Sequence, residues 1–290
     1  MSRITRFAPS PTGPLHLGHA FSAWEAARVA GDDGTFLLRI EDIDQSRARP
    51  EWEAQIFDDL TWLGLSWPTP VLRQSDHLPR YRDALERLWD DGLLYRCTCR
   101  RKDIEMALSA PQEGVAPAFG PDGLIYPGTC REVGRPRPNE PRPDDAVLRL
   151  DMGRAVAKTG DLWFQEDGTG PNGETGRISI PADQIVQATG DIILARRDMG
   201  TSYHLSVVVD DAVQKITHVT RGQDLFEATQ IHCVLQTLLD LPRPIYHHHR
   251  LIRDENGKRL AKRDDARAIA KYREDGLNPA DLHRMVGLRP

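Results

Sequence analysis

The sequence feature that most limits the fold of this chain lies between residues 4 and 31. Residues 4–8, ITRFA, predict a short strand, and the next six residues, PSPTGP, can continue neither a strand nor a helix. From Leu17 onward, apolar residues recur at helical spacing until Gly31, which is placed to end the helix. The sequence therefore predicts a strand, a tight turn and a helix in direct succession.

Two histidines, His16 and His19, lie where this helix begins. Because they are three residues apart on a first helical turn, they share one face of the helix. The unpaired N–H groups and the positive dipole end of a helix form an anion site, so two imidazoles there can donate hydrogen bonds to a phosphate. Two histidines alone are more often a surface or packing feature, and it is the surrounding string that favours phosphate binding.

The full string APSPTGPLHLGH resembles the "HIGH" signature of class I aminoacyl-tRNA synthetases, in the glutamyl and glutaminyl branch. This resemblance implies an α/β fold with a Rossmann-type parallel sheet as the catalytic domain. It also implies that ATP is bound by His16, Gly18 and His19. In this family the two histidines act in catalysis, by stabilising the charge that develops on the phosphate.

Charged residues follow two other predicted strands at their carboxyl ends. Glu41 follows the strand predicted over 35–40, and Arg221 follows the strand predicted over 216–220. In an open α/β sheet these ends border the ligand crevice, where an arginine can bind a carboxylate through two parallel hydrogen bonds. Taken alone, Glu41 would fit a solvated turn and Arg221 a surface salt bridge.

The motifs around these residues, LRIEDID, YHL, VDD and HVTRGQD, resemble the same synthetase branch, and residues 203–211 are predicted to form a further strand. In the family, the equivalent of Glu41 faces the ammonium group of the amino acid. The glutamate-binding residues that the resemblance implies are Arg6, Ala8, Ser10, Glu41, Tyr203 and Arg221. A fixed arginine charge suits a dicarboxylate such as L-glutamate and discriminates against glutamine.

One position departs from the pattern of glutamyl-tRNA synthetases. Those enzymes usually carry asparagine directly after the tyrosine of this motif, where the present chain has His204. The departure removes an amide contact, and it moves the resemblance toward the glutamyl-queuosine subgroup of the family.

Three of the four cysteines, Cys97, Cys99 and Cys130, lie in or beside a stretch rich in proline and glycine, whereas Cys233 lies in an apolar helical stretch typical of a core. Without a secretory signal, clustered cysteines favour a metal over disulfides. The C-x-C spacing is tighter than in most zinc sites, and three reduced thiols in a small core fit it equally well.

The resemblance favours the metal. The glutamyl-queuosine subgroup carries C-x-C followed by Y-x₃-C, and the residues here have the same spacing. It implies one structural Zn²⁺, with four protein ligands and no open position. The implied ligands are Cys97, Cys99, Tyr126 and Cys130. Tyr126 is the unusual member, since a phenol with a pKa of about 10 must lose its proton to bind.

Residues 259–263, RLAKR, resemble the "KMSKS" loop of class I synthetases, with Lys262 at the retained lysine and Ala261 in place of serine. The resemblance implies that Lys262 is catalytic and holds the phosphates of ATP, with Mg²⁺ on the pyrophosphate. A basic loop alone is usually solvated surface. The preceding histidines, residues 247–249, would point to opposite faces of a strand, which favours a packing and loop role over a metal site.

The resemblance divides the chain into four segments. Residues 1–96 are the first half of the catalytic sheet domain, 97–193 an inserted zinc-binding module like the one that holds a tRNA acceptor end, 194–250 the second half of the sheet, and 251–290 the KMSKS-like loop with a short helical region. Short strands are predicted in the module over 146–150, 163–164, 178–180, 186–188 and 192–195. The anticodon-binding domain of a full glutamyl-tRNA synthetase is expected to be absent.

Composition excludes several classes of protein. The net charge of −5 does not fit a generally basic nucleic-acid binder, so contact with RNA requires a local patch. No apolar run is long enough to span a bilayer, and the N-terminal residues lead into a strand without a signal peptide. We expect a cytoplasmic enzyme with no membrane partner, acting as a monomer.

The function implied by the resemblance is a two-step ligation. L-Glutamate is activated by ATP to glutamyl-adenylate without tRNA, and is then transferred to the queuosine base at the wobble position of tRNA(Asp). One alternative is a minimal glutamyl-tRNA synthetase that charges a tRNA 3′ end, against which His204 and the missing anticodon domain argue. Another is an inactive paralogue that only binds tRNA or amino acid, against which His16, His19 and Lys262 argue.

Overall fold

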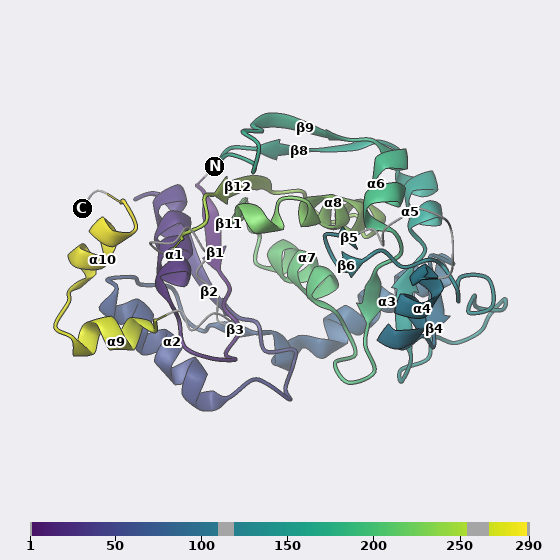
Figure 1. Ribbon diagram of the computed structural model, residues 1–290, viewed down its shortest axis with the longest axis horizontal. Helices are drawn as coiled ribbons and strands as arrows, with labels where there is room; N and C mark the ends of the chain where they lie inside the picture. The colour runs from purple at the N-terminus through teal and green to yellow at the C-terminus, as the bar shows by residue number, and fades with distance from the viewer. Residues whose placement is uncertain (1, 110–118, 254–266, 289–290) are drawn as a thin grey trace.

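A computed structural model describes residues 2–109, 119–253 and 267–288 of the chain (Figure 1). One part of the molecule carries a mostly parallel sheet, and the other carries a smaller antiparallel sheet with its own helices. Across the described ranges, no helix is both long enough and apolar enough to cross a membrane.

The larger sheet is built from two groups of strands. Its members are β1 (Ile4–Phe7), β2 (Thr35–Ile40), β3 (Leu72–Arg73), β8 (Leu162–Glu166), β9 (Gly176–Ile180), β11 (His218–Gly222) and β12 (Ile245–His249). Of the pairings among these described strands, only β8–β9 is antiparallel. The groups meet beside β1, where the Thr217 N–H donates to the Ile4 carbonyl over 2.9 Å and the Ile4 N–H donates to Thr217 Oγ1 over 2.8 Å.

The order β3-β2-β1-β11-β12-β8-β9 places a topological switch point between β1 and β11. The chain leaves β1 through α1 (Leu17–Ala30) toward β2, and reaches β11 on the other side of β1. At such a point the connections part in opposite directions and leave a crevice at the carboxyl ends of the strands. The α/β parallel sheet predicted from the sequence is confirmed.

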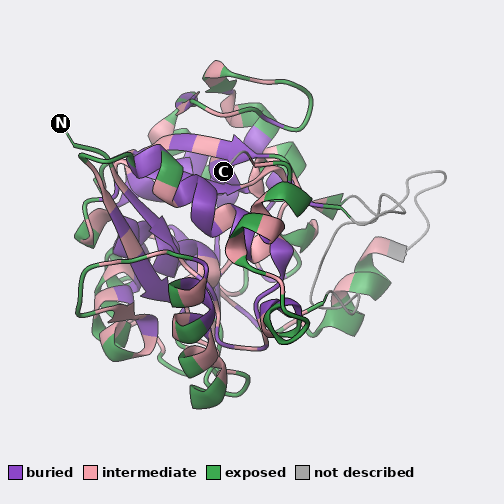
Figure 2. Cartoon of the chain, turned by 90° about the vertical axis from the view of Figure 1, so that its left-hand side faces the viewer, coloured by how far each residue is buried: buried purple, intermediate pink, exposed green. Residues whose placement is uncertain are grey.

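Helices pack on this sheet and enclose two apolar cores, where Figure 2 shows buried residues in the strands and on the inner sides of the helices. α1 packs across β1, β2 and β11, and its C-cap is Gly31, as predicted. The other elements of this part are α2 (Pro50–Trp62), the 3₁₀ turn Gln74–His77, α3 (Leu78–Asp90), α7 (Tyr203–Val213), the 3₁₀ turn Gln223–Leu225, α8 (Ala228–Leu238), α9 (Ile269–Glu274) and α10 (Pro279–Met285).

The smaller sheet has the order β10-β7-β4 and is antiparallel. Its strands are β4 (Leu94–Cys97), β7 (Val147–Leu150) and β10 (Ile193–Ala195), accompanied by the ribbon β5 (Phe119–Gly120) and β6 (Gly123–Leu124) and by α4 (Arg101–Ser109), α5 (Met152–Thr159) and α6 (Ala182–Thr189). β8 joins the larger sheet through its pairing with β12, so the segment 97–193 contributes to both sheets. The boundaries of the four segments remain a prediction.

Two segments predicted as strands are helices. Residues 203–211 lie in α7 and residues 186–188 in α6. The error in α7 has a physical cause, because this helix is buried on nearly every side, and a continuous apolar run does not distinguish a buried strand from a buried helix. Ser202 was the missed signal, since its side chain caps the helix by accepting from the Leu205 N–H.

Residues 247–249 form part of β12 and not the loop that the sequence predicted. Their packing role is nevertheless correct. His249 Nε2 lies 2.9 Å from Ser22 Oγ on α1, whereas the neighbouring His248 points to the other side of the strand, toward Glu166. Adjacent residues of a strand face opposite ways, as expected.

A buried ion network ties β1, β2 and α7 together at the switch point. Arg6 donates to both oxygens of Asp211, from Nε over 2.9 Å and from Nη2 over 3.2 Å. Arg39, which is fully buried, donates to Asp211 Oδ1 over 2.7 Å and to Glu41 Oε1 over 3.0 Å. Burial opposes the ionisation of Asp211, but the two arginines outweigh it and hold the pKa of this carboxyl below its usual value.

We predict that Asp211→Asn destabilises the protein strongly. The substitution removes the charge that Arg6 and Arg39 share, and an uncompensated buried charge costs about 3 kcal/mol or more of unfolding free energy. Urea denaturation measures this loss. The matched control is Asp240→Asn, whose carboxylate pairs with Arg87 in solvent and whose loss should cost less than about 1 kcal/mol. Equal effects of the two substitutions would contradict the network's role.

Candidate active site and metal centre

A cavity of about 360 Å³ lies at the switch point, where β1 and β11 end and α1 begins. Most of the residues predicted for the active site line it. These are Arg6, Ala8, His16, Gly18, His19, Glu41, Tyr203 and Arg221. Some of these residues lie more than two hundred positions apart in the sequence, as Arg6 and Arg221 do. The fold therefore places residues from separate sequence motifs around one cavity.

A second cavity, of about 570 Å³, adjoins the first. Ala8, Glu41 and Tyr203, which are predicted to bind glutamate, line both cavities together with His19, which is predicted to bind ATP. Ser10 lines the second cavity and not the first. The second cavity reaches Ile193 in β10 of the smaller sheet. The space beside the predicted active site is therefore large enough for a second substrate.

The histidines of the first helical turn cap α1 reciprocally. The Gly18 N–H donates to His16 Nδ1 over 3.1 Å, and the His16 N–H donates to His19 Nδ1 over 3.2 Å. Each Nδ1 accepts a hydrogen bond, so each neutral ring carries its hydrogen on Nε2. The rings lie 3.8 Å apart at an angle of 30°. The backbone thus fixes the tautomer in which both imidazoles can donate from Nε2.

Lys262 lies outside the described residues, so its predicted position over ATP stays a prediction. The described residues on either side of its segment both lie beside the first cavity. Ile252 lines that cavity, and Ala268 forms a β-bridge with His16. The Ile269 N–H also donates to the Leu15 carbonyl over 2.8 Å.

Arg6 and Arg221 are both buried arginines at the ends of neighbouring strands, but their partners differ. Arg6 is occupied by Asp211, so it lines the cavity with its charge already compensated. Arg221 donates only to neutral acceptors, namely Thr229, His232 and His248. Among the residues that the structure describes, no carboxylate forms an ion pair with Arg221.

Glu41 and Tyr203 line the same cavity as this arginine. Burial raises the pKa of Glu41, against the pull of Arg39 and Arg6, and its salt bridge with Arg39 keeps one oxygen occupied. Burial also raises the pKa of Tyr203, whose phenol therefore stays neutral and can donate a hydrogen bond. The cavity presents a carboxylate and a guanidinium from different elements, which suits a ligand that carries both an ammonium group and a carboxylate.

Sequence reasoning missed the residues that surround Arg221. His232 and Thr229 lie three residues apart on one face of α8, and both are buried polar side chains. Two polar residues at helical spacing within a largely apolar stretch were a usable signal. His248 was assigned only to packing. Glu166, at the end of β8, was not singled out at all. A buried carboxylate that contacts a buried histidine can be found only once the strand order is known.

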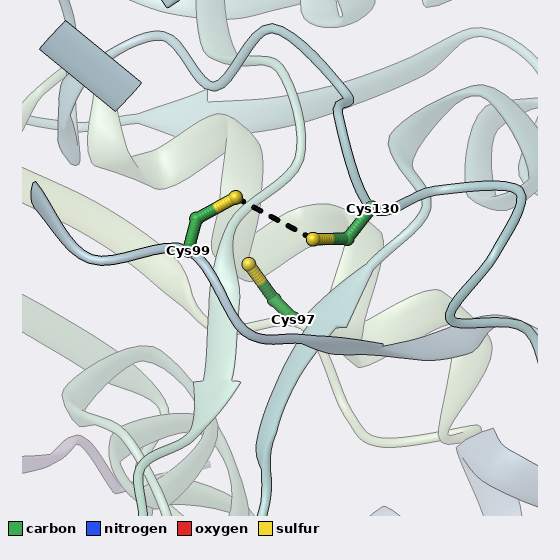
Figure 3. Close-up of side chains that lie close together, drawn as sticks. All are labelled: Cys97, Cys99 and Cys130. Atoms are coloured by element: carbon green, nitrogen blue, oxygen red, sulfur yellow. Dashed lines mark hydrogen bonds between the residues drawn. The ribbon is translucent and has the colours of Figure 1, made fainter. Parts of the chain in front are cut away.

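The three cysteines among the predicted metal ligands lie close together (Figure 3). The sulfur atoms of Cys97, Cys99 and Cys130 lie within 4.8 Å of one another, and all three cysteines are free of disulfides. The Tyr126 oxygen lies 3.6 Å from the sulfur of Cys97 and 3.4 Å from that of Cys99. This cluster could hold a metal ion. Cys233 is buried in α8, as predicted.

The distances from the Tyr126 oxygen to the sulfurs fit four-coordinate binding. A tetrahedral ion with metal–sulfur bonds of about 2.3 Å and a metal–oxygen bond of about 2.0 Å separates sulfur from oxygen by about 3.5 Å. The two sulfur–oxygen distances bracket this value, whereas the 3.4 Å between the sulfurs of Cys99 and Cys130 is shorter than the roughly 3.8 Å that the same geometry gives two sulfurs. Arg149 lies over the Tyr126 ring at 3.9 Å, and its positive charge favours a phenolate.

Comparisons with known proteins identify the family of this chain. A family model described as "tRNA synthetases class I (E and Q), catalytic domain" matches residues 3–122 and 169–290. A Rhodobacter capsulatus protein named Glutamyl-Q tRNA(Asp) synthetase is 64% identical over 288 residues, which cover 98% of this chain and 100% of that protein. A Nocardia farcinica protein of the same name is 40% identical over 294 residues, covering 98% of this chain and 85% of that protein.

Among solved structures, the crystal structure of a glutamate tRNA ligase from Elizabethkingia meningosepticum in complex with its amino acid is similar in fold. Its TM-score is 0.74 at 24% identity. The match covers 99% of this chain and 61% of that one.

We predict that the side chain of His16 stabilises the protein by capping the N-terminus of α1. The side-chain oxygen introduced by His16→Asn keeps an acceptor for the Gly18 N–H, whereas His16→Ala leaves that donor unpaired. His16→Ala should unfold about 1 kcal/mol more easily than His16→Asn, and urea denaturation of both variants measures the difference. Equal stabilities would contradict the capping role.

Proposed function

The chain belongs to the class I glutamyl- and glutaminyl-tRNA synthetase family and is a ligase, and we propose that its substrates are L-glutamate, ATP and a queuosine-containing tRNA(Asp). The observation that carries the glutamate assignment is Arg221, a buried arginine that lines the cavity and has neutral partners among the described residues. A buried guanidinium without a counter-ion favours a carboxylate ligand. Glu41 is proposed to receive the ammonium group.

The first step is activation. An oxygen of the α-carboxylate of glutamate attacks the α-phosphorus of ATP, the bond to the bridging oxygen breaks, and pyrophosphate leaves with glutamyl-adenylate remaining. No protein nucleophile is required, since positioning and charge stabilisation lower the barrier. His16 and His19 would donate from Nε2 to phosphate oxygens at the N-terminus of α1. Lys262 is proposed to hold the phosphates together with Mg²⁺.

The second step transfers the glutamyl group. A hydroxyl of the acceptor attacks the carbonyl carbon of the adenylate, and AMP leaves. The proposed acceptor is the cyclopentenediol of queuosine in tRNA(Asp), and it rests on the names of relatives that are 64% and 40% identical to this chain. The second cavity supports this step, because it adjoins the proposed glutamate site and is large enough for a nucleobase. The alternative acceptor is the 3′ end of a tRNA.

We propose that the cluster of Cys97, Cys99, Tyr126 and Cys130 holds one structural Zn²⁺. The donor set and the sulfur–oxygen distances fit that ion. Four protein ligands leave no position for substrate, so the ion would stabilise the fold and take no part in the reaction. Burial raises the pKa of the Tyr126 phenol, so its ionisation would need the cation.

We predict one zinc ion per chain in freshly purified protein, measured by elemental analysis. Tyr126→Phe removes one ligand and should lower the affinity for zinc by about tenfold or more in competition with a chelator. Tyr272→Phe, which lies outside the cluster, should leave zinc affinity unchanged. Protein without zinc, or a Tyr126→Phe variant that binds zinc as tightly as the native chain, would refute the proposed site.

The proposed acceptor is tested with labelled glutamate, ATP and Mg²⁺, using tRNA from cells that make queuosine and from cells that cannot. We expect label only on queuosine-containing tRNA. Periodate cannot distinguish the two acceptors, because it oxidises both the 3′ terminal diol and the cyclopentenediol. The matched control is therefore queuosine-containing tRNA from which the 3′ nucleotide has been removed, and transfer to it should remain intact. Equal labelling of both tRNA samples would favour charging of the 3′ end.

A further inference from the structure

Arg221 is held by two histidines whose tautomers can be assigned from hydrogen-bond polarity. Arg221 Nε donates to His248 Nε2 over 3.1 Å, and Arg221 Nη1 donates to His232 Nδ1 over 2.9 Å. A guanidinium has five N–H donors and no acceptor, so the histidine nitrogen facing it must be unprotonated. Each neutral ring therefore carries its hydrogen on the nitrogen that faces away from Arg221.

The outward-facing hydrogen of His248 points at a buried carboxylate. His248 Nδ1 lies 2.6 Å from Glu166 Oε2, and neither side chain is exposed. The other oxygen of Glu166 accepts the backbone N–H groups of His248 and Gly168, each over 2.8 Å. Because Arg221 donates to Nε2, a neutral His248 carries its hydrogen on Nδ1, and Glu166 Oε2 accepts from it. This contact favours the His248 tautomer that presents a lone pair to Arg221.

A second path runs from Arg221 through α8 and α7. His232 Nε2 lies 3.1 Å from His204 Nδ1, and His204 Nε2 lies 3.4 Å from Asp122 Oδ1. The same polarity applies along this path, since each ring accepts on the side of Arg221 and donates away from it. Asp122 is partly exposed and makes a looser contact, so this path is weaker than the one through His248.

We propose that Glu166 and His248 are positioning residues for substrate recognition, which hold Arg221 in place while keeping its guanidinium free of a direct carboxylate partner. Arg6 has no histidine between it and its carboxylate, and Asp211 accepts directly from two of its nitrogens. Within the described part of the chain, Arg221 donates three of its five N–H groups to neutral partners, which leaves one on each terminal nitrogen for a ligand carboxylate.

The interposed histidine also resolves an energetic conflict. A buried guanidinium needs negative charge nearby, yet a carboxylate in direct contact would compete with the substrate. Glu166 supplies the charge through one neutral ring. Burial lowers the pKa of His248 to about 4, although its bond with Glu166 opposes the shift, so the ring stays neutral at physiological pH. This inference rests on the proposed glutamate-binding function of Arg221.

The decisive variant is Glu166→Gln. The amide oxygen can still accept the backbone N–H groups of His248 and Gly168, but the amide nitrogen now faces His248 Nδ1 and donates to it. His248 must then carry its hydrogen on Nε2. Two N–H donors, His248 Nε2–H and Arg221 Nε–H, then face each other, and the hydrogen bond between these residues is lost. The loss of a hydrogen bond to a charged group predicts a glutamate affinity roughly 10- to 100-fold lower, with ATP affinity unchanged.

The control is Glu174→Gln, the same substitution in the loop that joins β8 and β9, which should change glutamate affinity by less than about twofold. Calorimetric titration with glutamate and with ATP gives the affinities. Nitrogen-15 spectra of the histidine rings give the tautomers, and we expect His248 to carry its hydrogen on Nδ1 in the native chain and on Nε2 in Glu166→Gln.

A Glu166→Gln variant that binds glutamate as tightly as Glu174→Gln would overturn the proposal. A native His248 with its hydrogen on Nε2 would overturn it as well, and this reading needs no variant, so it decides the matter even where Glu166→Gln does not fold. A native chain that binds no glutamate contradicts the proposed function instead. In that case the histidine tautomers of the native chain still show whether His248 presents an unprotonated Nε2 to Arg221.

Discussion

The structure depends on how charge is distributed where β1 and β11 end. Two arginines are buried on these neighbouring strands, and burying an ion without compensation is costly. Arg6 is compensated directly by Asp211, which also accepts from Arg39 and so fastens α7 to β1 and β2. Arg221 is compensated indirectly, through His248 and Glu166. One arginine thus serves the fold and the other remains available to a ligand.

The strand order explains why these groups meet. β1 and β11 are neighbours although most of the sequence between them forms other elements, and the switch point between them opens the crevice that α1 borders. The first turn of α1 brings two imidazoles whose tautomers are fixed by the backbone. Two imidazoles, a carboxylate and a guanidinium therefore surround one cavity, which is the arrangement that the proposed activation of an acidic amino acid by ATP would use.

Much of this arrangement could be predicted from the sequence, because the residues concerned stand in strong local patterns. The string around His16 has a strand, a turn and a capped helix within one short segment, and the structure has the same elements. Cys97, Cys99, Tyr126 and Cys130 were brought together by spacing and resemblance, and their atoms converge. The helix α7 was not predicted, since its apolar run is compatible with either kind of buried element.

The groups around Arg221 could not be predicted for a different reason. Glu166 and His248 lie 82 residues apart, and His232 belongs to a third element. Such contacts depend on strand order and on which way each side chain points, and no local pattern carries that information. Arg6 shows the same limit, because the sequence indicated a substrate contact and not the ion pair with Asp211 that the fold provides.

The central claim is that Arg221, which no described carboxylate contacts directly, selects glutamate for activation. The most direct test is ATP–pyrophosphate exchange by the native chain without tRNA, with glutamate and glutamine compared at equal concentration. The account predicts exchange with glutamate and a rate at least about 100-fold lower with glutamine, whose neutral amide cannot pair with the guanidinium. Exchange that is equal for the two amino acids, or absent with glutamate, would contradict it.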